Sequence, residues 1–334
     1  MTVIERALAT LTTLALAGCW HDPFPPPSTA RAGDPAHPRL VAPTESKPGP
    51  PLPAPPAGKP CGALGCLAFN TPREAFAYTL RSMPRVIAIG EAHAQKAAPN
   101  VESATRRFGR DFIPDLAQGR IVPDPLQPLE VPPRARSRVT GIIIELLAPN
   151  HACEQHEEQA VAERTKPVTA PQAETNQNDF VALGFEAKKF GIQPEPLIPT
   201  CDELKGVLTT QEGDIAALLE LIATITVREA FDFLDHKPPD EAIAIYGGLL
   251  HNDTNPKPDH AAWSFGPRLL EHARGSYVEV DLIVPELIRN EEPWTNLPWF
   301  PHYDPTRQGT ATWLYQTGTA SFVLIFPKTA TKEP

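Results

Sequence analysis

Short, mostly apolar segments alternate along the chain with segments of helical periodicity. The clearest apolar segments are 86–89, 139–147 (centred on three isoleucines), 242–245, 277–284 and 321–326. Strands without inside–outside alternation are buried on both faces, as in parallel sheets covered by helices. Helical character is found at 71–81, 101–117, 179–190, 214–236 and 267–273. This alternation predicts an α/β fold with a mostly parallel central sheet flanked by helices.

Helix ends support this interpretation. Thr71-Pro72-Arg73-Glu74 is a capping box with proline at the first helical position, so a helix is expected to begin at this point. Pro84 ends it before the first apolar strand. The 214–236 helix has an apolar stripe that includes Leu218 and Ile222, which indicates one buried face.

Proline is concentrated near the N-terminus. The chain has 334 residues and 41 prolines, fourteen of them between His21 and Pro60. Such a segment suits an extended spacer, so we expect 19–60 to be a disordered linker and 61–334 to be a single folded domain. The net charge of -10 argues against a nucleic-acid partner, which would need a basic face.

The first eighteen residues have the character of an export signal. Arg6 precedes an apolar run from Ala7 to Ala17, which is too short to span a bilayer. The run ends in Leu16-Ala17-Gly18-Cys19, which resembles the bacterial lipobox, with Cys19 as the lipidated residue; an ordinary signal with an incidental cysteine is the alternative. Trp20, rather than an aspartate, follows the cysteine. We expect a protein lipid-anchored in the bacterial cell envelope, at the outer membrane, and either periplasmic or surface-exposed.

Four further cysteines follow the expected anchor. An even number in an exported protein favours disulfides, and Cys61–Cys66 is the local choice, which leaves Cys153–Cys201. Four cysteines allow three pairings. A metal cluster is the competing interpretation, although the spacing matches no zinc template.

Three apolar strands end in residues of catalytic type. The sequences at these ends are Gly90-Glu91-Ala92-His93, then Glu145, then Gly247-Gly248-Leu249-Leu250-His251. Ligands in open α/β sheets bind beyond the carboxyl ends of the strands, so neighbouring strands would bring these groups to one cleft. Two histidines and two carboxylates can hold a divalent metal or supply a general base with its orienting carboxylate.

Simpler interpretations exist for each residue alone. A histidine after a strand is often a loop residue, and a glutamate at a strand tip is often a cap. Glu145, directly after three isoleucines, is harder to explain in this way because burying an unpaired charge is costly. Asp281 lies on a later strand, and we leave it outside the predicted site. An aromatic segment around Trp299 and Trp313 is either a lid or pocket wall, or packing over the sheet edge.

These motifs resemble a superfamily that joins erythromycin esterases, ChaN-type haem-binding lipoproteins and TraB/Tiki proteins. Gly90-x-x-His93 and Gly248-x-x-His251 match its paired G-x-x-H motifs, and Glu145 matches the glutamate between them. The threonine of the esterase motif is absent, and so is the further histidine of ChaN-type proteins. The resemblance implies a basic residue from the helix after the first motif, for which Arg106 or Arg107 is the candidate.

We therefore expect an anchored hydrolase of peptide, ester or lactone bonds, with or without a divalent metal, acting on a small-molecule or peptide substrate. Glu91, His93, Glu145 and His251 are the expected catalytic residues; Arg106 and Tyr246 would bind substrate; Glu91, His93 and His251 would hold Mn, Zn or Fe. The alternative is a binding lipoprotein of ChaN type without turnover, in which His251 or Tyr246 ligates haem. The carboxylate pair favours the enzyme, because haem capture does not need it.

Overall fold

The computed structural model describes residues 58–119, 138–153, 159–161, 163, 166, 170–209 and 215–329. The chain divides after Leu40 into two units, and every described residue belongs to the second. The expected signal peptide, Cys19 and nearly all of the expected linker lie outside the described residues. Across the described ranges, no helix combines the length and the hydropathy needed to cross a bilayer.

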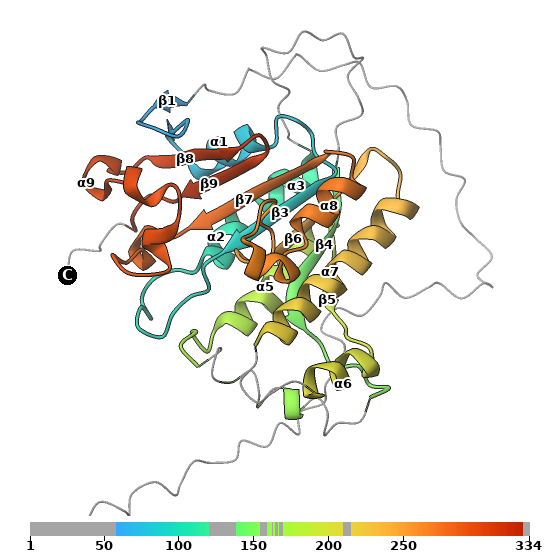
Figure 1. Cartoon of the computed structure of the whole chain (residues 1–334). Coiled ribbons are helices and arrows are strands. Elements are labelled where there is room, and N and C mark those ends of the chain that lie inside the picture. Colours follow the sequence, from blue (N-terminus) through green and yellow to red (C-terminus); the bar gives the residue numbers. More distant parts are fainter. Residues whose placement is uncertain are drawn as a thin grey trace, which may run out of the picture. The chain divides into compact units, whose positions relative to one another are not determined.

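The described strands form one sheet in the order β1-β2-β8-β9-β7-β3-β6-β4-β5 (Figure 1). The six strands from β9 to β5 are all parallel, whereas β8, β2 and β1 add antiparallel pairs at one edge. The strand bounds are β1 Lys59–Pro60, β2 Leu67–Phe69, β3 Val86–Glu91, β4 Arg138–Leu147, β5 Gln193–Leu197, β6 Glu241–Gly248, β7 Tyr277–Ile283, β8 Thr312–Gly318 and β9 Ser321–Ile325. The prediction of a mostly parallel α/β sheet is confirmed.

Helices cover both faces of the sheet. The bounds are α1 Pro72–Thr79, α2 Ala104–Asp111, α3 Ile113–Gln118, α5 Asn176–Lys189, α6 Cys201–Thr209, α7 Ala216–His236, α8 Gly266–His272 and α9 Pro305–Gln308. On one face, α1, α2, α3 and α5 enclose a core with Ile87, Ile142 and Ala244, while on the other α7 and α8 pack on Val86, Ile143 and Ile243. Adjacent strand residues therefore enter opposite cores, which explains why the strands are apolar without alternation.

The burial of β3 and the start of α1 agree with the sequence expectation. All six residues from Val86 to Glu91 are buried, and β3 lies between β6 and β7 in the middle of the parallel part of the sheet. The expected capping box is also formed, with Thr71 accepting from the Glu74 backbone and the Glu74 side chain accepting from the Thr71 backbone.

Two segments differ from the sequence expectation, and the structure also places the aromatic segment. The expected 101–117 helix is two helices that meet at Phe112, because Pro114 at the start of α3 has no backbone N–H to continue the ladder. Lys59–Pro60, assigned to the linker, instead pairs with β2. The aromatic segment packs at the sheet edge, where Trp299 and Trp313 are buried with Tyr315.

Two disulfides join the cysteines as expected. Cys61 pairs with Cys66, and Cys153 pairs with Cys201, each with 5.2 Å between the two α-carbons. The first closes a short loop between β1 and β2. The second links the segment after β4 to the start of α6, beyond the carboxyl ends of β4 and β5.

Candidate functional site

The strand ends that carry the candidate residues are neighbours, in the order β3-β6-β4. Glu91 is in register with Gly248, and Ile144, which precedes Glu145, is in register with Tyr246. As a result, one carboxylate oxygen, Oε1 of Glu145, faces two imidazoles. It lies 3.9 Å from Nε2 of His93 and 3.7 Å from Nε2 of His251.

Two glycines of β6 give Glu145 its position. Oε2 of Glu145 accepts a hydrogen bond of 2.5 Å from the backbone N–H of Gly248. A Cβ on Gly247 would overlap Oε2 and lie 3.0 Å from the Cβ of Glu145, so the carboxylate rests directly on the Gly247 backbone. A Cβ on Gly248 would lie 3.2 Å from Nε2 of His93. The glycines therefore leave room for the carboxylate and the first imidazole.

Glu91 orients His93 and keeps it charged. Nδ1 of His93 donates to Oε1 of Glu91 at 2.9 Å. Burial alone would lower the pKa of His93, but the hydrogen bond to Glu91 and the charges of Glu145 and Glu91 outweigh it and raise the pKa to about 9. At neutral pH the ring is an imidazolium, and its Nε2–H lies on the side of Glu145.

The other oxygen of Glu91 is also occupied. Oε2 accepts from the Thr105 hydroxyl at 3.1 Å and from the Tyr246 hydroxyl at 3.2 Å. Glu91 is 2% exposed, and Tyr246 is fully buried. Burial, followed by the charge of Glu91, raises the pKa of Tyr246 well above its ordinary value. Thr105 and Tyr246 therefore hold Glu91, which in turn orients His93.

A hydrogen bond to a backbone carbonyl sets the tautomer of His251. Its Nδ1 lies 2.7 Å from the carbonyl oxygen of Trp263, which can only accept, so Nδ1 carries the proton. In the neutral ring Nε2 is then the acceptor, and it faces Glu145. The His251 backbone carbonyl accepts from the Phe265 N–H and the Ser264 hydroxyl. The 263–265 segment therefore holds both the ring and the backbone of His251.

The expected metal set does not fit this arrangement. Both oxygens of Glu91 already accept hydrogen bonds, and Nδ1 of His93 is engaged with one of them. Within the described ranges, no group of three His, Cys, Asp or Glu side chains forms a cluster that could hold a metal ion. We therefore derive the chemistry of the site from the side chains themselves.

A pocket of about 270 Å³ lies along the segment that follows His93, and none of the four predicted catalytic residues lines it. It is formed by the chain that follows His93 and by the start of α5, with Gln95, Lys96, Arg106, Glu174 and Asp179 among its polar residues. Nε of Arg106 donates to Oδ1 of Asp179 at 2.7 Å, and Ser103 donates to Oδ2 of the same carboxylate at 2.8 Å. The terminal amino groups of Arg106 have no hydrogen-bond partner among the described residues, and its side chain is 58% exposed.

The neighbouring arginine serves another part of the fold. Arg107 is buried and donates to the Pro327 carbonyl and the Thr329 hydroxyl, so it ties α2 to the C-terminal segment. Of the two candidates, only Arg106 lines the pocket along the segment after His93.

The haem interpretation has less support from the geometry. The Tyr246 hydroxyl is buried and donates to Glu91, and Nδ1 and Nε2 of His251 face Trp263 and Glu145. The pocket along the segment after His93 is small and lined by charged groups, whereas haem requires an apolar slot.

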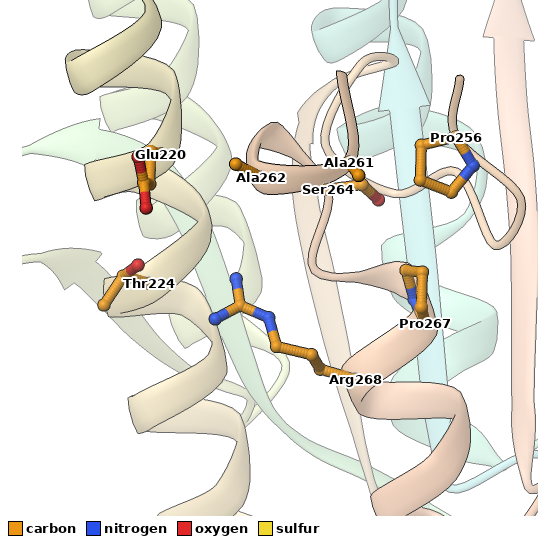
Figure 2. A pocket seen from close by; sticks show the side chains of 8 residues that line it. All are labelled: Glu220, Thr224, Pro256, Ala261, Ala262, Ser264, Pro267 and Arg268. Atoms are coloured by element: carbon orange, nitrogen blue, oxygen red, sulfur yellow. The ribbon is translucent and has the colours of Figure 1, made fainter. Parts of the chain in front are cut away.

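A second pocket, of about 350 Å³, lies between α7 and the 256–268 segment (Figure 2). The Arg268 side chain extends into it from α8, and Glu220 and Thr224 border it from α7. None of the four predicted catalytic residues lines this pocket. Its wall includes Ser264, so the same segment borders the pocket and supports His251.

The chain matches no family model and no curated protein. A solved structure described as "The structure of the type III effector HopBA1" is 12% identical, with a TM-score of 0.34. The alignment covers 82% of this chain and 99% of that one. A likeness at this TM-score carries no argument about the function of this chain.

Sequence reasoning missed the groups that hold the catalytic candidates in place. Thr105 is the second residue of α2, and nothing in the sequence indicates that it reaches Glu91. The partner of His251 is a backbone carbonyl, which no side-chain pattern can reveal.

Proposed function

We propose that this chain is a hydrolase in which Glu145 and His251 activate water and the His93 imidazolium stabilises the oxygen on which negative charge develops. The observation that carries the proposal is the approach of Nε2 of His93 and Nε2 of His251 to the same oxygen of Glu145. One imidazole is a proton donor and the other an acceptor, so the site has an acid and a base on either side of one carboxylate.

Water activation follows from the tautomer of His251. Its Nε2 lies 3.7 Å from Oε1 of Glu145, too far for a direct hydrogen bond. A water about 2.8 Å from both atoms would donate one hydrogen bond to each. As it attacks, it would pass one proton to Nε2 of His251, which would then give that proton to the leaving alcohol or amine. The hydrogen bond to the Trp263 carbonyl places the proton of the neutral ring on Nδ1, so Nε2 is the nitrogen that can receive a proton.

His93 supplies the acid. Its Nδ1–H is held by Glu91, which leaves Nε2–H, on the side of Glu145, as the donor available to a substrate oxygen. A carbonyl oxygen placed against this N–H would be polarised, and the tetrahedral intermediate of an ester, lactone or peptide bond would be stabilised. The pocket along the segment after His93, with Arg106 on its wall, is the proposed substrate pocket.

The test is turnover of a panel of p-nitrophenyl esters, lactones and fluorogenic peptides by the purified chain. We expect Glu145→Gln and His251→Gln to lower kcat by about a hundredfold or more, the contribution of a general base. His272→Gln is the matched control, because this histidine pairs with Asp235 at 2.8 Å on the α7–α8 side of the fold.

Two results would contradict the proposal. One is the absence of turnover across the whole panel, or equal turnover by wild type and Glu145→Gln. The other is turnover that chelation abolishes and a divalent metal restores, which would replace the metal-free mechanism.

We further propose that the chain works outside the cytosol, as a lipid-anchored envelope protein. The two disulfides support an oxidising compartment, and the anchor rests on the lipobox resemblance at Cys19. Fractionation of cells that express wild type and Cys19→Ser tests this. The wild type is expected in the membrane fraction and the variant outside it; equal partition would contradict the anchor.

A further inference from the structure

A mostly buried carboxylate lies next to the turn that carries His251. Asp281 is on β7, in register with Gly90 of β3. Its Oδ1 accepts a hydrogen bond of 3.0 Å from Nδ2 of Asn252, the residue directly after His251. The Asn252 backbone carbonyl also accepts from the buried Tyr277 hydroxyl at 2.8 Å. β7 therefore holds the His251 turn through both the side chain and the backbone of Asn252.

The contact is close because β3 has a glycine at this level. A Cβ on Gly90 would lie 2.6 Å from Oδ1 of Asp281 and 2.7 Å from Nδ2 of Asn252. Gly90 is in register with Gly247 on its other side, where Glu145 rests on the backbone. Gly90 of β3 and Gly247 of β6 are therefore neighbours across two adjacent strands. The Asp281–Asn252 pair lies against Gly90, and the Glu145 carboxylate lies against Gly247.

The Asn252 amide has one end without a partner. Asn252 is 1% exposed, and its Oδ1 makes no hydrogen bond within the described part of the chain. An ionised carboxylate can only accept, so it can satisfy the NH₂ group of Asn252 but not its oxygen. Exchanging the amide oxygen and nitrogen does not help, because the amide oxygen would then lie 3.0 Å from an ionised carboxylate oxygen with no proton between them. A protonated Asp281 has an O–H donor as well as an acceptor oxygen, which is the pair of groups that the two ends of the Asn252 amide require.

The surrounding charges favour the protonated form. The charged groups that act on Asp281 are Glu279 on the same strand and Asp253 in the turn, both acidic. Val323 of β9 and Gly90 of β3, its partners across the sheet, do not titrate. Burial, followed by the charge of Glu279, raises the pKa of Asp281 well above its ordinary value.

We propose that Asp281 is a positioning residue, a neutral carboxylic acid that both accepts from and donates to the Asn252 amide and so fixes the turn that carries His251. Its proton remains on the acid and takes no part in turnover. The effect on activity rests on the proposed hydrolase function, whereas the protonation state and the pairing do not.

The test compares Asp281→Asn with Asp281→Ala, Asn252→Asp and the exchanged double variant, by the melting temperature of the purified chain between pH 5 and 8. The native acid retains a proton that the unfolded chain releases above about pH 4. Stability from this residue is therefore lost as the pH rises. We expect the melting temperature of Asp281→Asn, relative to wild type, to increase steadily with pH, because asparagine offers both hydrogen bonds without titrating.

The other variants test the pairing itself. Asp281→Ala should melt below Asp281→Asn at every pH. Asn252→Asp places two acids together and should lose stability with pH more steeply than wild type, and the exchanged variant should return to the wild-type slope. A melting temperature of Asp281→Asn that falls relative to wild type as the pH rises would show an ionised Asp281 and overturn the proposal.

Turnover gives an independent readout. Asp281→Asn should keep the wild-type kcat, while Asp281→Ala should lower it by about tenfold or more through displacement of His251. Equal loss of kcat in both variants would overturn the positioning role. If the wild type turns over nothing, the hydrolase proposal fails while the melting data still decide the state of Asp281.

Discussion

Gly247→Ala adds a single methyl group beneath the Glu145 carboxylate. Gly247 is not among the glycines with positive φ, so alanine is compatible with the backbone and the effect of the change is steric. The new Cβ would overlap Oε2 of Glu145 and lie 3.0 Å from its Cβ. The carboxylate must therefore move, and it loses its hydrogen bond to the Gly248 N–H.

The displacement should be visible at His93. With Oε1 of Glu145 3.9 Å from Nε2 of His93, Coulomb's law at an effective dielectric constant of about 20 gives an attraction of about 4 kcal/mol. At about 6 Å the attraction is about 3 kcal/mol, a loss that corresponds to roughly one pKa unit. We expect the pKa of His93 to fall from about 9 to about 8.

The assay is an NMR pH titration of the histidine ring signals, with His93→Gln to assign the signal of His93. Gly206→Ala is the matched control, because Gly206 lies in α6 and a Cβ there would meet nothing within 4 Å. The control should titrate as wild type does. A His93 pKa that stays at about 9 in Gly247→Ala would refute the placement of Glu145 over Gly247.

Two further predictions concern stability. The pKa of His93 is raised to about 9 in the folded chain, so charged His93 stabilises the fold fully below about pH 6.5. This contribution to the free energy of unfolding, about 3 kcal/mol, is lost as the pH rises through 9. Urea unfolding at a series of pH values should show the loss in wild type but not in His93→Gln, and an equal pH dependence in both proteins would contradict it. Replacing both cysteines of the Cys153–Cys201 pair, which are 48 residues apart, should cost about 4 kcal/mol on the chain-entropy model. The Cys61–Cys66 pair, 5 residues apart, should cost about 2 kcal/mol by the same relation, and the reverse order would contradict this account.

The centre of the sheet could be predicted from the sequence because its strands are buried on both faces. Val86–Ile89 and Ile142–Ile144 have no polar residue that would suit a half-exposed strand. Their polar ends mark the carboxyl edge, so Glu91 and Glu145 could be assigned to one edge once the strands were taken as parallel. The glycines after Ala242–Tyr246 gave the same signal for the third strand.

The edges of the sheet could not be predicted in this way. β5 contains Pro194 and Pro196, which are typical of a loop, and it is tolerated as a strand because it pairs only with β4. β8 contains Trp313 and Tyr315, whose aromatic rings pack with Trp299 at the sheet edge. The aromatic residues in the sequence indicated a cluster here, but they did not indicate that Thr312–Gly318 is a strand.

The supports of the site depend on register, which local sequence does not determine. Asp281 reaches Asn252 only because β7 lies beside β3 with Gly90 between them. The Trp263 carbonyl reaches His251 through a loop whose path follows from tertiary packing. The sequence therefore indicated the candidate residues at the strand ends and not the residues that orient them.

The most direct test of the account is the pH dependence of kcat on the best substrate of the panel, for wild type and Glu91→Gln. If charged His93 stabilises the developing oxyanion, kcat falls as the pH rises past about 9. In Glu91→Gln this decline moves to lower pH, because the hydrogen-bonded carboxylate that keeps the ring protonated is gone. A kcat that stays level through pH 10 in both proteins would contradict the account.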